Sequence, residues 1–107
     1  MKTGEEITEE IIEMLLLLGN TKDEVANNLH KRGIKGKRRI CRSCPIAEYL
    51  GYKDTGIQVG YDFDYRLWIY RIDNSLSKLY FSQFAHIVDF IIDFDMGKYP
   101  FLIDCRS

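Results

Sequence analysis

The spacing of apolar residues changes twice along this chain of 107 residues, and no other feature constrains its fold as strongly. In 5–18, apolar residues recur every three or four positions, which is the spacing of an amphipathic helix. In 57–63 they alternate with polar residues and glycine, as in a strand with one buried face, and helical spacing returns in 84–94. Helices before and after a short run of strands predict an α+β fold with a small antiparallel sheet.

Local start and stop signals place two helices in the N-terminal third. The first helix ends at Gly19-Asn20, because both residues accept the left-handed conformation found after a helix. Thr21 is the expected N-cap of the second helix, with Glu24 completing a capping box, and Gly33 ends that helix near residue 32. The expected buried stripe of this helix consists of Val25, Ala26 and Leu29, and can extend to His30.

A short third helix is predicted over 46–50. Ser43 or Cys44 can cap it, Pro45 suits its first position, and Gly51 closes it.

The strand of 57–63 is expected to form a β-hairpin with a second strand over 66–72, and 78–81 can add a third short strand. A last, long helix is expected to begin after Ser82 and to end at Gly97, about fifteen residues later.

Length and net charge limit the functions that the chain can have. A chain of this length forms one domain, here 1–107. The net charge of −1 argues against a protein that coats nucleic acid.

The N-terminus is acidic and its longest apolar run, 14–18, is too short for a signal peptide or a membrane span, so a cytoplasmic protein without a membrane partner is expected. Three cysteines, an odd count, argue against a disulfide framework.

The segment 31–42, named here the basic loop, concentrates positive charge. It carries seven of the fifteen Lys and Arg residues and no acid. Several such side chains could bind phosphates in a salt-dependent way, or they could simply balance the acidic first helix. The candidate binding residues here are Lys31, Arg32, Lys35, Lys37, Arg38, Arg39 and Arg42.

Metal and redox chemistry have a partial signal in Cys41 and Cys44. A structural zinc site needs four ligands, and the only other soft ligands, His30, His86 and Cys105, lack ligand spacing. A redox pair normally follows a buried strand, which is missing before Cys41. The position of Cys44 is explained by its expected role as the N-cap of the third helix. No metal and no cofactor are therefore expected.

An enzyme is not predicted either. His86, Asp89 and Asp93 share one face of the last helix and could hold a metal or act as an acid–base pair, but this face is also the polar side of an amphipathic helix. The chain has no recognisable nucleophile motif and no phosphate-binding glycine loop.

The hairpin is rich in aromatic residues on both predicted faces. One face holds Tyr61, Phe63, Tyr65, Leu67 and Ile69, and the other holds Arg66, Trp68, Tyr70 and Ile72. Both faces could be core, or one could be uncovered. Because Arg, Trp and Tyr dominate interface hot spots, Arg66, Trp68 and Tyr70 are further candidate binding residues.

The chain also resembles a type of small bacterial protein that shares its framework. The matching segments are Gly19-Asn20-Thr21, Val25-Ala26, Gly33-Ile34-Lys35-Gly36, 44–50 and 94–100. The resemblance implies no activity and transfers no functional residue. It implies that Cys44 belongs to the framework around the third helix, whereas Cys41 has no counterpart there.

These features together predict a small binding protein without catalysis, acting on a protein partner through the aromatic hairpin and the basic loop. An accessory protein or inhibitor, of phage or plasmid type and directed at a nucleic-acid enzyme, would suit this size and charge, and self-association could use the same surface. The first alternative is a winged-helix-like domain that binds nucleic acid through the basic loop. The second is a structural zinc or thiol protein.

Overall fold

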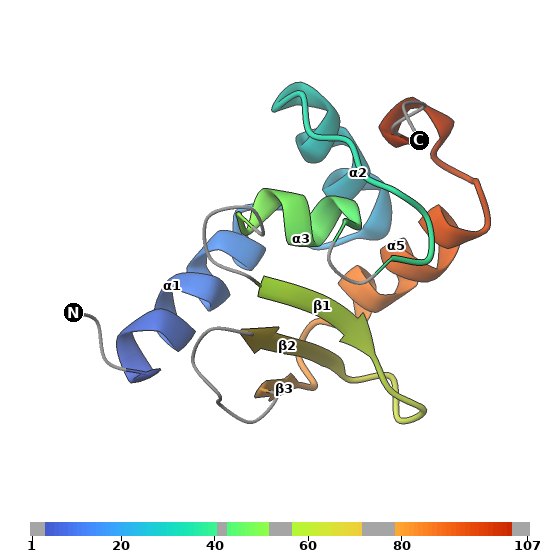
Figure 1. The fold of residues 1–107 in the computed structure, drawn as a ribbon. Coiled ribbons are helices and arrows are strands. Elements are labelled where there is room, and N and C mark those ends of the chain that lie inside the picture. Colours follow the sequence, from blue (N-terminus) through green and yellow to red (C-terminus); the bar gives the residue numbers. More distant parts are fainter. Residues whose placement is uncertain (1–3, 41–42, 52–56, 72–78, 104–107) are drawn as a thin grey trace.

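Three antiparallel strands in the order β1-β2-β3 form one sheet in this computed structural model (Figure 1). The residues that the structure describes are 4–40, 43–51, 57–71 and 79–103. The strands are β1 (Ile57–Tyr61), β2 (Leu67–Arg71) and β3 (Leu79–Phe81). The predicted hairpin and third strand are therefore confirmed, while Ile72 and Lys78 lie outside the described residues.

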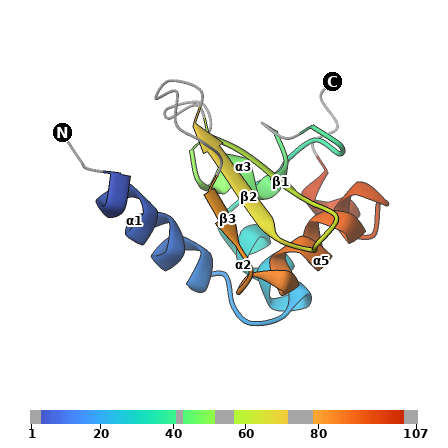
Figure 2. The ribbon, with the colours of Figure 1, turned by 90° about the horizontal axis from the view of Figure 1, so that it is seen from below.

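The helices complete the predicted α+β fold. They are α1 (Gly4–Leu16), α2 (Lys22–Lys31), α3 (Pro45–Tyr49), α5 (Ala85–Asp95) and the short 3-10 helix η2 (Pro100–Leu102). Helices α2, α3 and α5 lie on one side of the sheet, and α1 lies beside it (Figures 1 and 2). The order of two helices, a short helix, a sheet and a C-terminal helix is as expected from the sequence.

The core lies between the sheet and these helices. Alternation puts Val59 of β1 and its cross-strand partner Ile69 of β2 on the helix-facing side, where both are buried. The apolar stripe of α5 packs against them. The buried residues of this stripe are Ile87, Val88, Phe90, Ile91 and Phe94.

The opposite face of the sheet is covered by no helix or strand within the described ranges (Figure 2). Trp68 and Tyr70 are half-buried there, and Tyr80 of β3 is exposed. The two-face prediction holds for the strands, but Phe63, Tyr65 and Arg66 belong to the turn between β1 and β2 and to neither face.

The helices follow the sequence signals with three corrections, two at helix ends and one in the burial of a side chain. Thr21 caps α2 as expected, because its Oγ1 accepts the N–H of Glu24 at 3.1 Å. Helix α1 ends at Leu16, two residues early. His30 is exposed rather than buried, and its ring contacts Phe101 with centroids 5.0 Å apart.

The third correction concerns the last helix. Ser82 is exposed and does not cap it; α5 begins at Ala85 after Phe84 and has 11 residues. Burial decides this start, because the ring of Phe84 is buried against Phe81 at a centroid distance of 5.8 Å. The helix consequently starts without a side-chain cap.

Candidate functional site

Most of the basic loop is a fixed structure. The N–H of Gly36 donates to the carbonyl of Leu102 at 2.9 Å, and the N–H of Lys37 donates to the carbonyl of Ser43 at 2.7 Å. Gly36 is packed so tightly that a Cβ would lie 2.5 Å from the backbone N of Pro45. The loop is therefore held both to the C-terminal segment and to the start of α3.

Cys44 caps the N-terminus of α3, as expected. Its Sγ accepts the N–H of Ala47 at 3.4 Å, and Pro45 occupies the first turn of the helix. Gly51, with φ of 88°, follows the helix as expected.

Two arginines of the basic loop lie at the C-terminal end of α5. The N–H of Arg39 donates to Asp95 Oδ1 at 2.8 Å, and a Cβ on Gly97 would lie 3.1 Å from Arg38 Nη1. A cation is favourable at this end of a helix. Arg39 also has φ of 62°, a left-handed conformation that is uncommon for a residue with a side chain.

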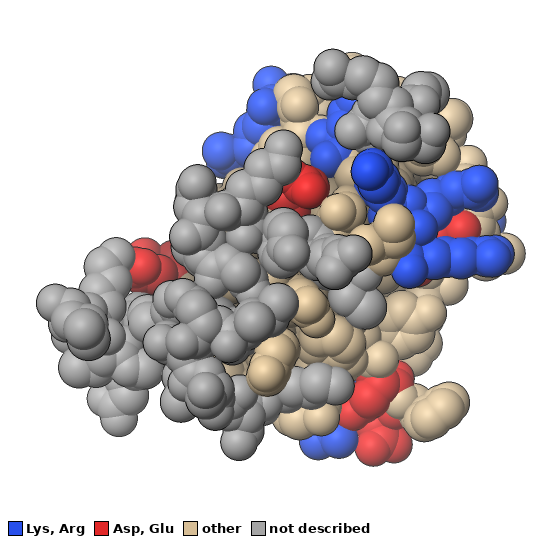
Figure 3. All heavy atoms as spheres, viewed as in Figure 1, with Lys and Arg blue, Asp and Glu red and all other residues tan. Residues whose placement is uncertain are grey.

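The remaining predicted basic residues are spread more widely. Lys31 ends α2 and Arg32 caps it, with the Arg32 guanidinium 5.4 Å from the centre of the Tyr49 ring. Lys35 is exposed, Lys37 is half-buried, and Arg42 lies outside the described residues. Figure 3 shows Lys and Arg gathered over the upper part of the molecule, around α2 and the basic loop.

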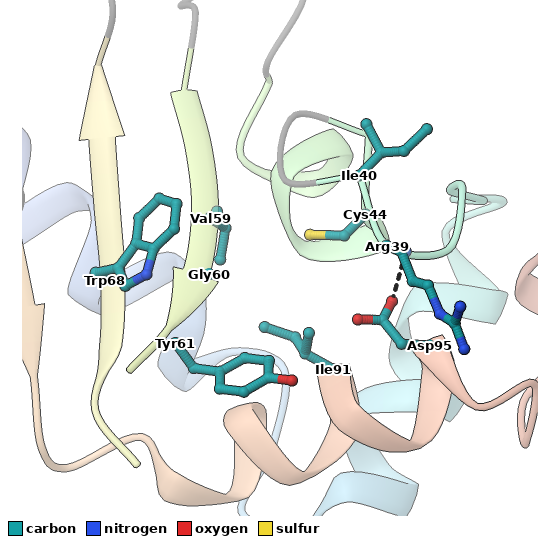
Figure 4. A pocket seen from close by; sticks show the side chains of 9 residues that line it. All are labelled: Arg39, Ile40, Cys44, Val59, Gly60, Tyr61, Trp68, Ile91 and Asp95. Carbon is teal, nitrogen blue, oxygen red and sulfur yellow. Dashed lines mark hydrogen bonds between the residues drawn. The ribbon is translucent and has the colours of Figure 1, made fainter. Parts of the chain in front are cut away.

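A hollow of about 260 Å³ lies between the basic loop, β1 and the C-terminal half of α5 (Figure 4). We name it the β1 hollow. Its lining residues are Arg39, Ile40, Cys44, Val59, Gly60, Tyr61, Trp68, Ile91 and Asp95. It joins Arg39 and Ile40 of the basic loop to Tyr61 and Trp68 of the hairpin, so two regions singled out in the sequence meet at one place.

The floor of the β1 hollow depends on one glycine. Gly60 faces Trp68 across the β1–β2 pair, and the indole lies so close that a Cβ on Gly60 would be 2.2 Å from Trp68 Cζ2. The missing side chain therefore lets the indole lie over β1. In Figure 4, Tyr61 points from the end of β1 toward Ile91 of α5.

The hairpin turn beside the β1 hollow is organised by Asp62. Its N–H donates to the carbonyl of Arg66 and its carbonyl accepts the N–H of Tyr65, both at 3.1 Å. Its Oδ1 accepts the N–H groups of Asp64 and Arg66, both at 3.0 Å. The donation from the Arg66 backbone is the main reason why the pKa of Asp62 lies below its usual value.

The tip of this turn is an exposed aromatic ring. Phe63 is fully exposed, and the next aromatic residue, Tyr65, has φ of 64°. The Tyr65 hydroxyl donates to Asp89 Oδ1 of α5 at 2.6 Å, and this bond raises the pKa of Tyr65. The turn is thus tied to α5.

Arg66 and Tyr70 do not line the β1 hollow. The Arg66 guanidinium pairs with Asp62 Oδ2 at 2.8 Å and lies 4.7 Å from the centre of the Tyr80 ring. Tyr70 is half-buried further along β2. Of the three hairpin residues expected to bind, only Trp68 reaches the β1 hollow.

The polar residues of α5 have separate partners. Asp93 pairs with Lys22 Nζ at 2.7 Å and with Lys98 Nζ at 3.4 Å, whereas Asp89 accepts from Tyr65. His86 Nε2 is buried with no hydrogen-bond partner in the described structure. No cluster of three or more His, Cys, Asp or Glu that could hold a metal occurs among the described residues, which leave out Cys41 and Cys105.

Sequence reasoning missed several residues of the β1 hollow. Ile91 and Asp95 lie four residues apart on α5, and nothing in the sequence indicated that Ile40 of the basic loop meets this helix. Gly60 did carry a signal, because glycine inside a strand often marks a close approach of another group.

No described helix is long and apolar enough to cross a membrane. Comparison with protein families, curated proteins and solved structures gives no match to this chain.

Proposed function

We propose that this chain is a small non-catalytic binding protein that takes a protein partner at the β1 hollow and the adjoining basic loop. It acts as an accessory protein, inhibitor or modulator, and its positive surface suits a partner that itself handles nucleic acid. The observation that carries this proposal is the meeting of Arg39 and Ile40 with Tyr61 and Trp68 in one hollow.

The chemistry of the β1 hollow supports a protein partner. Ile40, Tyr61 and Trp68 offer apolar and aromatic surface, and Arg39 adds a cation at the edge. Interface hot spots favour Trp, Tyr and Arg in pockets from which water is excluded. Ile40 is 37% exposed and Tyr61 is 40% exposed, so both can contact a partner.

Nucleic-acid binding is the second candidate, favoured by the gathering of Lys and Arg in Figure 3. Within the described residues, no ion pair neutralises Lys31, Lys35 or Lys37. The winged-helix form of this idea gains little support, because Pro45, Ile46 and Ala47 of the short helix α3 are buried and cannot enter a groove.

Retention of a partner tests the leading proposal. The wild-type chain, Ile40→Glu and the matched control Leu17→Glu are each immobilised and incubated with a lysate of the source cells. Leu17 is 64% exposed on the segment after α1, so the control places the same charge on an exposed apolar site away from the β1 hollow. We expect one protein to be retained equally by wild type and Leu17→Glu, and at least about tenfold less by Ile40→Glu.

Equal retention by Ile40→Glu would show that the β1 hollow is not the binding surface. Far-UV circular dichroism of the three proteins checks that each is folded.

Salt dependence tests the second candidate. If Lys37, Arg38 and Arg39 each contact a duplex phosphate, raising salt from about 50 to 200 mM weakens DNA binding about 40-fold. Replacing all three by Ala should then remove most of this dependence. Binding that is absent at low salt, or unchanged in the triple variant, would rule out this candidate.

A further inference from the structure

We propose that the β1 hollow is occupied by Phe63 of a second copy of this chain, so that two copies form a closed dimer. The inference rests on the proposed function, because it names the partner of that same surface.

Phe63 has the properties of a preorganised anchor. Its ring is fully exposed, yet the turn that carries it is held by four hydrogen bonds of Asp62, two from its backbone and two from its side chain, and by the bond from Tyr65 to Asp89. A rigid anchor loses little conformational entropy on binding. An exposed aromatic ring on a fixed turn is therefore suited to insertion into another molecule.

The β1 hollow has the size and lining to receive this ring. Its volume is about 260 Å³, and Ile40, Tyr61, Trp68 and Ile91 supply apolar walls. A cavity of about 150 Å³ lined by apolar side chains is enough to hold benzene. By volume, the β1 hollow is therefore large enough for one phenyl ring.

The exposed charges beside the anchor and the β1 hollow differ in sign. Asp64 follows Phe63, and its side chain is 80% exposed although it lies 3.7 Å from Arg66 of its own chain. Arg39 lines the β1 hollow together with Asp95, and exposed Arg38 precedes Arg39, so cations outnumber acids there. Insertion of Phe63 from another copy would bring an aspartate toward these arginines, an arrangement that also speeds association.

The position of the anchor favours a closed dimer over a chain of copies. Tyr61 ends β1 and lines the β1 hollow, and Phe63 is only two residues further on, in the turn, so at most about 7 Å of chain separates them. Anchor and hollow therefore lie side by side, and one two-fold rotation can place each Phe63 in the hollow of the other copy. Such two-fold interfaces are the commonest in soluble oligomers.

Sedimentation equilibrium of the full chain over a range of concentrations tests the proposal. The wild type and the control Leu17→Ser should reach twice the mass of one chain. Phe63→Ser and Ile40→Glu should each weaken the dimer at least about tenfold, because each change damages both reciprocal contacts.

Mixing the two damaged variants gives a sharper result. In the mixed pair, Phe63 of the Ile40→Glu chain meets the undamaged hollow of the Phe63→Ser chain, so one of the two contacts is intact. We expect the mixture to dimerise more strongly than either variant alone, which general unfolding or loss of solubility could not produce.

A wild-type chain that stays monomeric up to about 1 mM, the weak end of measurable affinities, would overturn the inference. A dimer that survives Phe63→Ser, or a mixture no stronger than its components, would also overturn it. The dimer and the proposed function can fail separately. A monomeric chain whose captured partner is still lost on Ile40→Glu contradicts the dimer, but it keeps the proposed function and gives the β1 hollow a different occupant.

Discussion

At the scale of single residues, two side chains occupy conformations that glycine would adopt at lower cost. Arg39 and Tyr65 have φ values of 62° and 64°, and no other described non-glycine residue has a positive φ. Arg39 lines the β1 hollow, and Tyr65 fixes the turn beside it. Strained residues of this kind cluster at functional sites, where the surrounding structure holds them in place.

Arg39→Gly should separate stability from binding. Relief of the left-handed conformation, reduced by the flexibility that glycine adds to the unfolded chain, should raise the free energy of unfolding by about 0.5–1 kcal/mol. Removal of the cation should weaken partner retention. Urea denaturation and the retention assay measure the two effects, and a less stable variant with unchanged retention would contradict this account of Arg39.

Gly60→Ala should disturb the β1 hollow through the only tryptophan of the chain. The new Cβ would meet the Trp68 indole at 2.2 Å, so the indole must move and the overpacking should cost about 1–3 kcal/mol. Tryptophan emission reports the movement directly. Gly33→Ala is the control. It is also destabilising, because Gly33 has φ of 70°, but nothing lies within 4 Å of its added Cβ and the indole is not touched. An emission change equal to that of the control would refute the contact.

At the scale of elements, α2 and α5 are joined by the Asp93 ion pair. Hydrogen bonding from Lys22, then from Lys98, keeps the pKa of Asp93 below its usual value although burial opposes this shift. A carboxyl group with a lowered pKa contributes stability above its unfolded pKa, about 4, and this contribution is lost as pH falls through the lower folded value.

Asp93→Asn should therefore reduce the acid sensitivity of the fold. The variant should be less stable than wild type at pH 7, and the difference should shrink as the pH falls below about 4. Urea midpoints at pH 7, 4 and 3 measure this difference. A constant difference across the three pH values would mean that Asp93 acts by packing rather than by charge.

Elements with local chemical signals could be predicted from the sequence. Thr21 and Cys44 cap helices through atoms close in sequence, and the alternation of β1 needs only the period of a strand. The start of α5 could not be predicted in this way, because the burial of Phe84 against Phe81 of β3 overrides the local preference for Ser82.

At the scale of the whole molecule, the β1 hollow unites segments that are distant in the chain. The basic loop and the hairpin each had a compositional signal, but their meeting depends on long-range contacts such as that of Arg39 with Asp95. Sequence patterns contain no information on such contacts. This is why Lys31, Arg32, Arg66 and Tyr70 were singled out while Ile40 and Asp95 were missed.

The central claim is that one surface, the β1 hollow, takes a protein partner. A photo-crosslinking amino acid placed at Ile40, and separately at Leu17, tests it in living cells. The account predicts a covalent adduct with one defined protein, a second copy included, at position 40 and none at position 17. No adduct at position 40, or the same adduct at both positions, would contradict it.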